Sequence, residues 1–355
     1  MELRQLKRFY DLLGNDALRA AALTFAESLG VSKELVRMDT NDVCNIECIM
    51  CSNRPEKCTA DRMISLDDFK KVMSSIRRGL RFLYLSCSYE PLMTPHFEDY
   101  LAVAKSAGAP FISFATNGLL LRDDFIHFLV DEGIHEVILS MNGFTKEDYD
   151  RIMFRSRYDR VIEKLTVLRD YKRSKSSSLP RIRINTILMK TNVLSFDSIV
   201  SFINTYDVDT AQFRSFKVDE KHNNNPLEIE KERLTSITPD EIERLAAHIR
   251  KEVEALTAAG KLIIMPKDLL TTGKIGEAQD ASRQGSCSIP FFSSWIDFMG
   301  NVRVCCGEHE LAHIGNILTD TPEVLKSKRA RFREMALLGR CRKNCLMYIN
   351  SSTMM

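Results

Sequence analysis

Residues 35–51 read LVRMDTNDVCNIECIMC, a β-rich run that is followed at once by three cysteines. Leu35–Asp39 has the residue types of a strand, and Cys44, Cys48 and Cys51 follow it with the spacing C-x3-C-x2-C. Three thiolates on one short loop can bind three irons of a cubane cluster. The fourth iron then has no protein ligand, and such an open position is typical of a catalytic metal site.

The strand-then-loop pattern recurs along the chain. Five further β-rich runs follow, each separated from the next by a helical pattern: Phe82–Ser86, Phe111–Thr116, Glu136–Met141, Ile182–Leu188 and Ala211–Phe216. Helices are predicted at Ser65–Arg78, Phe125–Asp131, Lys146–Tyr171 and 239–258, the first with Ser65 as its N-cap. Six βα repeats predict a parallel α/β sheet that curls into a full or partial barrel. Its active site is expected on the loops after the strand C-termini.

Composition and charge exclude several classes of protein. The chain has 50 Lys and Arg against 48 Asp and Glu, a net charge of +2, which gives no signal for a nucleic-acid or membrane partner. Neither a signal-peptide core nor an apolar run of membrane-spanning length is present in the sequence. We therefore expect a cytoplasmic protein, in which ten cysteines are metal ligands or reactive thiols rather than disulfides.

The cysteines fall into two groups, with Cys87 alone between them. Cys58 accompanies the first group, and zinc with Cys58 as fourth ligand is the alternative to the cluster. The second group is Cys287, Cys305, Cys306, Cys341 and Cys345. The segment from Gly300 to Cys306 predicts a hairpin that carries thiols to a strand end. Two cysteine pairs suit a fully ligated site, for which structural zinc is again an alternative.

The first cysteine segment resembles the hallmark of the radical S-adenosylmethionine (SAM) superfamily. The resemblance implies a partial (βα)6 TIM-like barrel in which a [4Fe–4S] cluster binds SAM through its open iron. One electron then cleaves SAM to methionine and a 5′-deoxyadenosyl radical, which abstracts hydrogen from a substrate. Met50 stands where the family often has an aromatic residue. The resemblance therefore implies that Met50 packs near the adenine.

Further strand ends carry the resemblance. After the second strand, Glu90-Pro91-Leu92 matches part of a family motif, which makes Glu90 the candidate acceptor for the SAM amino group. Thr116-Asn117-Gly118 follows the third strand and is a common family feature, and Gly118 permits a positive φ at the turn.

The fourth strand ends in Ser140-Met141-Asn142-Gly143, where relatives place a polar pair on the SAM ribose. The resemblance assigns that role to Ser140 and Asn142. It also makes Arg155 a candidate for the SAM carboxylate, since an arginine fork suits a carboxylate. The end of the sixth strand and the residues after it are charged, and Arg214, Lys217 and Glu220 are the candidates there to face the substrate.

The tail resembles the SPASM/twitch domains of many radical SAM enzymes. It implies a small C-terminal α+β domain with an auxiliary [4Fe–4S] cluster on four cysteines, namely Cys287, Cys305, Cys341 and Cys345. Cys306 is then spare and is a candidate hydrogen-atom donor. The expected domains are an N-terminal helical extension, the barrel, a segment of linker and helices, and the auxiliary domain, at 1–34, 35–221, 222–284 and 285–355.

The resemblance implies an oxidation or dehydrogenation of a small polar substrate, of the sugar or aminocyclitol type. An electron donor of the flavodoxin or ferredoxin type is implied as partner. Epimerisation and the modification of a peptide are the alternatives within the family. Outside it, a zinc-binding interaction module without enzymatic activity explains the cysteines but not the six βα units.

Overall fold

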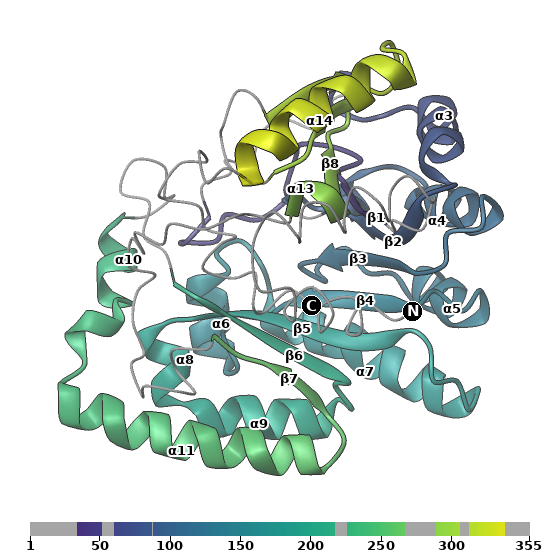
Figure 1. The fold of residues 1–355 in the computed structure, drawn as a ribbon. Coiled ribbons are helices and arrows are strands. Elements are labelled where there is room, and N and C mark those ends of the chain that lie inside the picture. The colour runs from purple at the N-terminus through teal and green to yellow at the C-terminus, as the bar shows by residue number, and fades with distance from the viewer. Residues whose placement is uncertain are drawn as a thin grey trace.

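The computed structural model of the chain describes residues 34–51, 60–86, 88–216, 226–266, 289–305 and 312–337. Within these residues ten strands form one sheet, in the order β10-β9-β8-β1-β2-β3-β4-β5-β6-β7 (Figure 1). The strands are β1 (Glu34–Met38), β2 (Leu80–Leu85), β3 (Ile112–Thr116), β4 (Glu136–Ser140), β5 (Arg181–Leu188), β6 (Thr210–Ser215), β7 (Leu262–Ile264), β8 (Ser293–Ile296), β9 (Asn301–Arg303) and β10 (His313–Asn316).

Strands β1 to β7 pair in parallel in chain order, which confirms the predicted α/β sheet. The connecting helices are α3 (Leu66–Ile76), α4 (Phe97–Ser106), α5 (Asp123–Asp131), α6 (Lys146–Ile152), α7 (Tyr158–Ser174), α8 (Lys190–Leu194), α9 (Phe196–Thr205), α10 (Pro226–Lys231), α11 (Pro239–Ala258), α13 (Ile289–Phe292) and α14 (Pro322–Leu337). Three 3-10 turns are η1 (Ala60–Arg62), η2 (Pro91–Met93) and η3 (Leu234–Ser236). Ser65 caps α3 as predicted, since its hydroxyl accepts a hydrogen bond from the Asp68 N–H at 3.1 Å.

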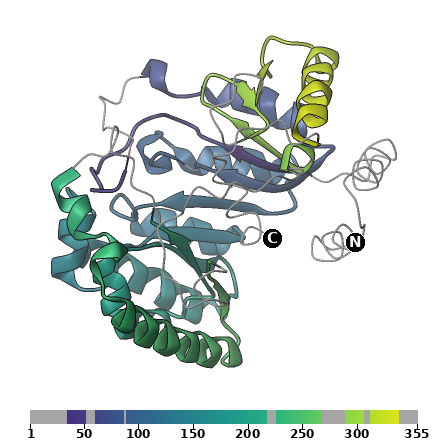
Figure 2. The same ribbon diagram turned by 60° about the vertical axis from the view of Figure 1, so that its left-hand side comes forward.

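Each parallel strand buries one apolar face beneath the helices. Fully buried side chains on this face include Val36, Leu83, Phe114, Val137, Leu139, Ile184, Ala211 and Phe213. Figures 1 and 2 show α9 and α11 along this side of the later strands. Burying each large apolar side chain stabilises the fold by about 1.5–3 kcal/mol, so this layer holds the sheet to its helices.

The predicted helical segment Lys146–Tyr171 is two helices rather than one. Helix α6 ends at Ile152 and α7 begins at Tyr158, with Arg155 between them in the left-handed region at φ +67°. The Ile152 and Phe154 carbonyls accept hydrogen bonds from the cysteine loop instead of from the next helical turn. Tertiary contacts thus override a locally helical sequence.

Two other segments differ from the sequence prediction. The segment read as a polar linker contains α10, which begins at Pro226 because proline is tolerated in the first turn of a helix. Ile229 and Glu232 of this segment are buried, at 0% and 1% exposure. Strand β7 was not predicted, since three residues give too little pattern to read.

The tail joins the sheet of the barrel. Strand β8 pairs in parallel with β1, on the edge opposite β2. Strands β8 and β9 pair antiparallel about Gly300 at φ +83°, so the predicted hairpin is confirmed. The Arg37 guanidinium on β1 lies 4.8 Å from the centre of the Trp295 ring on β8. An ion pair at 2.8 Å joins Arg329 of α14 to Glu34 of β1.

In the described part of the chain, no helix has both the length and the apolar character that crossing a bilayer demands.

Candidate active site

The loop after β1 carries the three cysteines, and its first half is fixed by Asn41. The Asn41 amide donates hydrogen bonds to the Glu90 carbonyl at 2.9 Å and to Thr94 Oγ1 at 2.8 Å. Its side-chain oxygen accepts from the Val43 N–H at 3.0 Å, and the Val43 carbonyl accepts from the Glu90 N–H at 3.0 Å. Asn41 is 1% exposed, so this amide ties the loop firmly to the end of β2. Asn41 is not among the residues predicted from the sequence, although an Asn that bonds the backbone two residues on is a recognised turn signal.

The second half of the loop is held by the turn between α6 and α7. The Glu47 N–H donates to the Phe154 carbonyl at 2.8 Å, and the Ile49 N–H donates to the Ile152 carbonyl at 3.0 Å. The Glu47 carboxylate forms an ion pair with Arg155 at 2.7 Å. The loop is therefore fixed from both sides before any cofactor binds.

The three thiols lie half-buried on this loop. Burial raises the pKa of Cys44 to about 11 and that of Cys48 well above its usual value, and the neighbouring thiols raise both further. Metal ligation requires thiolates, so a bound positive centre has to compensate their charge. Met153, 1% exposed, places its sulfur 3.5 Å from Cys48 Sγ.

The donor set fits an iron–sulfur cluster. Among the described residues, no three His, Cys, Asp or Glu side chains converge on a single metal ion. A cubane cluster needs no such convergence, because each cysteine binds a different iron. Cys58, the fourth ligand of the zinc alternative, lies outside the described residues.

Glu90 follows β2 and is buried, with 1% of its surface exposed. One carboxylate oxygen accepts from Thr116 Oγ1 at 2.8 Å and from the Leu92 N–H at 3.1 Å, and the other accepts from the Asn117 N–H at 2.8 Å. Burial raises the pKa of Glu90 to about 7, although these hydrogen bonds lower it. Glu90 thereby joins the ends of β2 and β3, and its contact with the SAM amino group stays a prediction.

Asn117 extends this connection to the cysteine loop. Its amide donates to Asn45 Oδ1 at 2.8 Å and lies 4.0 Å from Cys44 Sγ. Gly118 has φ +81°, as predicted for this turn. A Cβ there would lie 3.1 Å from the Val161 side chain, so space as well as φ favours glycine.

The end of β4 approaches the loop through Asn142. The Asn142 side-chain oxygen accepts from the Ile187 N–H at 2.8 Å, and its amide donates to Met153 Sδ at 3.2 Å. Asn142 therefore positions the sulfur that lies against Cys48, a role that the sequence did not indicate. Ser140 is half-buried at the last position of β4. The predicted contacts of Ser140 and Asn142 with the SAM ribose stay predictions.

The remaining predicted residues divide between described and undescribed parts of the chain. Met50 is half-buried against the core, Arg214 is exposed on β6, and Arg155 is paired with Glu47. Cys305 is 3% exposed after β9. The other predicted residues lie outside the described residues: Lys217, Glu220, Cys287, Cys306, Cys341 and Cys345.

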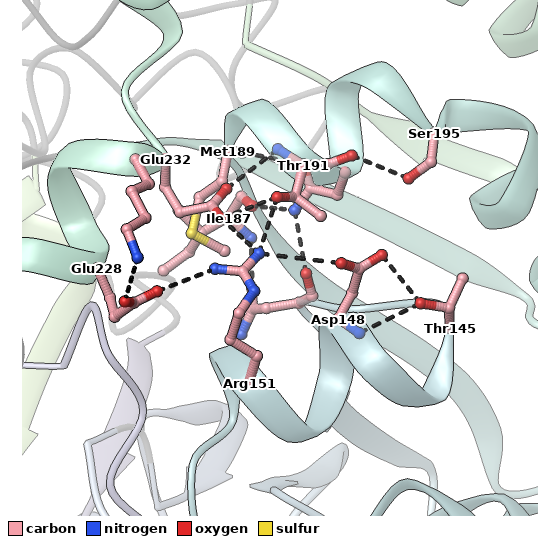
Figure 3. A network of polar contacts seen from close by, with 12 residues as sticks. Thr145, Asp148, Arg151, Ile187, Met189, Thr191, Ser195, Glu228 and Glu232 are labelled. Carbon is pink, nitrogen blue, oxygen red and sulfur yellow. Dashed lines mark hydrogen bonds and ion pairs between the residues drawn. The ribbon is translucent and has the colours of Figure 1, made fainter.

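A polar network connects α10 to α6 beside this site, with Arg151 at its centre (Figure 3). The Arg151 guanidinium donates to Glu232 at 2.6 Å and to Thr191 Oγ1 at 2.9 Å, and lies 3.6 Å from Glu228. Glu232 also accepts from the Thr191 N–H at 3.0 Å. Because Arg151 precedes Ile152, the network anchors the turn that holds the cysteine loop.

Replacing Arg151 by methionine is expected to lower the free energy of unfolding by about 1–3 kcal/mol, because the buried Glu232 carboxylate loses its cation. Urea denaturation of the variant measures this change. Arg157→Met, at an exposed position in the turn that follows α6, is the matched control and should change stability by less than about 0.5 kcal/mol. Equal effects of the two substitutions would show that the network contributes nothing specific.

Comparison with known proteins bears on this site. Residues 38–192 match the family model of the Radical SAM superfamily, a range that holds the cysteine loop, Glu90, Asn117 and Asn142. A protein of Sulfurisphaera tokodaii named "Probable GTP 3',8-cyclase" is 26% identical over 184 residues. The match covers 52% of this chain and 56% of that protein, so the chain spans little more than half of this relative.

Two solved structures share the fold. The structure of anSMEcpe with bound AdoMet has a TM-score of 0.59 at 14% identity and covers 88% of each chain. Streptococcus suis SuiB bound to S-adenosylmethionine has a TM-score of 0.64 at 14% identity, covering 90% of this chain and 74% of that one. Residues 38–192 therefore match the Radical SAM superfamily in sequence, and the chain shares its fold with these two structures.

Proposed function

We propose that this chain cleaves SAM reductively at the cysteine loop and uses the 5′-deoxyadenosyl radical to abstract hydrogen from a small polar substrate. The observation that carries the proposal is the loop itself. Its three cysteines lie at the C-terminal edge of the parallel sheet and are fixed by Asn41 on one side and by the turn after α6 on the other. When bound there, a [4Fe–4S] cluster supplies one electron to SAM.

The residues of the chain have distinct tasks in this proposal. Cys44, Cys48 and Cys51 bind the cluster. Glu90, Thr116 and Asn117 form a connected set at the ends of β2 and β3 that faces the SAM amino acid.

Three further residues complete the predicted SAM site. Ser140 and Asn142 at the end of β4 are proposed to bind the ribose. Arg155 reaches the SAM carboxylate by exchanging its ion pair with Glu47, and its 57% exposed side chain has room to do so.

The proposed outcome is an oxidation: after hydrogen abstraction, the substrate radical would give its unpaired electron to an auxiliary cluster and a proton to solvent. Cys305 is buried at the end of the β8–β9 hairpin, a setting that supports a ligand role. Cys287, Cys341 and Cys345 complete the proposed ligand set. A flavodoxin or ferredoxin in the cytoplasm is the proposed source of the first electron.

A second candidate is radical cyclisation of a purine nucleotide. It is favoured by the relatives named GTP 3',8-cyclase, at 25% to 27% identity over about half of this chain. Incubation with GTP separates the two candidates, because only the second consumes it.

The experiment that tests the proposal is anaerobic purification followed by incubation with SAM and dithionite. A brown protein with about eight irons per chain and 5′-deoxyadenosine as a product is expected, since each cubane holds four irons. Transfer of deuterium from a labelled substrate into 5′-deoxyadenosine then identifies the substrate. A colourless zinc protein that leaves SAM intact would contradict the proposal.

A further inference from the structure

Strands β3 to β6 have an unusually polar face opposite their apolar one. In the sheet register Ser140 lies beside Asn185 and Asn185 beside Gln212, while Arg183 lies beside Thr210 in the next row. Neighbours in register, and residues two apart along a strand, project to the same side of a sheet. The apolar residues between them, such as Ile184 and Ala211, face the helices. The polar rows therefore share the opposite, inner face.

This inner face holds an unusual set of buried polar atoms. Among the described residues, the buried side-chain atoms without a hydrogen-bond partner are Ser113 Oγ, Glu136 Oε2, Arg183 Nε, Asn185 Oδ1 and Thr210 Oγ1. Ser113 lies beside Glu136 in the register, and Glu136 is in the same alternation as Ser140, so all of these atoms belong to the inner face. Each such atom destabilises the fold if it stays unpaired, because burial removes its hydrogen bond to water. Their gathering on one face indicates a surface built to exchange hydrogen bonds with a ligand.

Arg183 gives this face its charge. Its guanidinium donates to Gln212 Oε1 and lies 3.6 Å from Glu136 Oε2, and its side chain is 14% exposed. Burial raises the pKa of Glu136, and Arg183 only partly offsets that rise. Arg183 thus meets Glu136 only at the long distance of 3.6 Å, and its Nε–H is unpaired. Nearer the C-terminal ends of the strands, Arg214 of β6 lies beside Ile187 of β5 in the register.

We propose that the inner face of β3–β6 is the substrate-recognition surface, and that it binds a polyhydroxylated substrate whose anionic group rests on Arg183. Asn185 Oδ1 and Thr210 Oγ1 then accept hydrogen bonds from substrate hydroxyl or amino groups. The Arg183 row lies about 7 Å deeper than the Ser140–Asn185 row, the length of two residues in a strand. A substrate anchored there extends toward the strand ends where SAM is proposed to bind, so this inference rests on the proposed function.

Equilibrium binding to the cluster-loaded protein with SAM tests the inference. The probes are ribose 5-phosphate and gluconate, which carry a phosphate or a carboxylate, and neutral ribose. We expect one of the two anions to bind at least tenfold more tightly than ribose, and the one that does identifies the anionic group. Arg183→Gln should weaken that binding at least tenfold. Arg173→Gln removes an exposed arginine of α7 that pairs with Asp207. This control should change the affinity for the anion by less than twofold.

Two further measurements make every outcome decisive. Asn185→Asp keeps the side-chain shape but adds a negative charge to the face, so it should also weaken anion binding tenfold, and it decides the matter if Arg183→Gln does not fold. Cleavage of SAM without substrate should be unchanged in Arg173→Gln, since Arg173 of α7 belongs neither to the cysteine loop nor to the inner face. If neither anion binds more tightly than ribose, or if the variants bind as the wild type does, the inference is wrong. Absence of SAM cleavage in the wild type would instead overturn the proposed function.

Discussion

Cys48→Ala is expected to reduce SAM cleavage to background, a loss of more than about 100-fold. Even substitutions of outer-shell partners at metal sites cost roughly 10–100-fold, and Cys48 is a direct ligand in the proposed cluster. In the described part of the chain the Met153 thioether lies 3.5 Å from Cys48 Sγ, and this group is no substitute for the thiolate. A neutral thioether does not replace the charge or the iron affinity of a thiolate.

Iron content, the electron paramagnetic resonance of the reduced protein and the yield of 5′-deoxyadenosine measure this effect. Cys341→Ala is the control, because Cys341 is a proposed auxiliary ligand in the tail. It should retain part of the SAM cleavage and lose the oxidised product. Full SAM cleavage by Cys48→Ala would show that the cysteine loop does not hold the reactive cluster.

The parts of the fold that were predictable depend on local signals. The six parallel strands, the Ser65 cap and the positive φ of Gly118 follow from strand patterning, side-chain capping and turn chemistry within a few residues. The cysteine loop was predictable for the same reason, since its three cysteines lie within one short segment.

The parts that were not predictable depend on contacts between distant segments. The break after α6 arises because the Ile152 and Phe154 carbonyls bond the cysteine loop about a hundred residues earlier in the chain. Met153 acquires its place against Cys48 through the same break. The pairing of β8 with β1 joins Leu35 to Ser293, and no local pattern encodes a register over such a separation. The unpaired atoms of the inner face likewise emerge only once β3 to β6 stand side by side.

Glu90 is expected to make the stability of the metal-free protein depend on pH. Burial raises the pKa of Glu90 from 4.5 to about 7 in the folded protein, so between these values the folded state retains a proton that the unfolded state has released. Stability falls with rising pH wherever the folded state binds more protons. The free energy of unfolding should therefore fall by about 3 kcal/mol from pH 4.5 to pH 7, at 1.36 kcal/mol for each pKa unit.

Glu90→Gln isolates this contribution, because glutamine does not titrate. Its amide also presents a donor to the Asn117 N–H where the carboxylate presents an acceptor, which leaves a buried donor unpaired at a cost of about 1–3 kcal/mol. The variant should thus be less stable than the wild type near pH 4.5, and the difference should shrink to zero or reverse as the pH rises to 7. Urea denaturation across this range measures both curves, with Glu254→Gln at an exposed site on α11 as the control. A constant difference between wild type and Glu90→Gln would mean that Glu90 ionises in the fold as it does in water, its three donors having fully offset its burial.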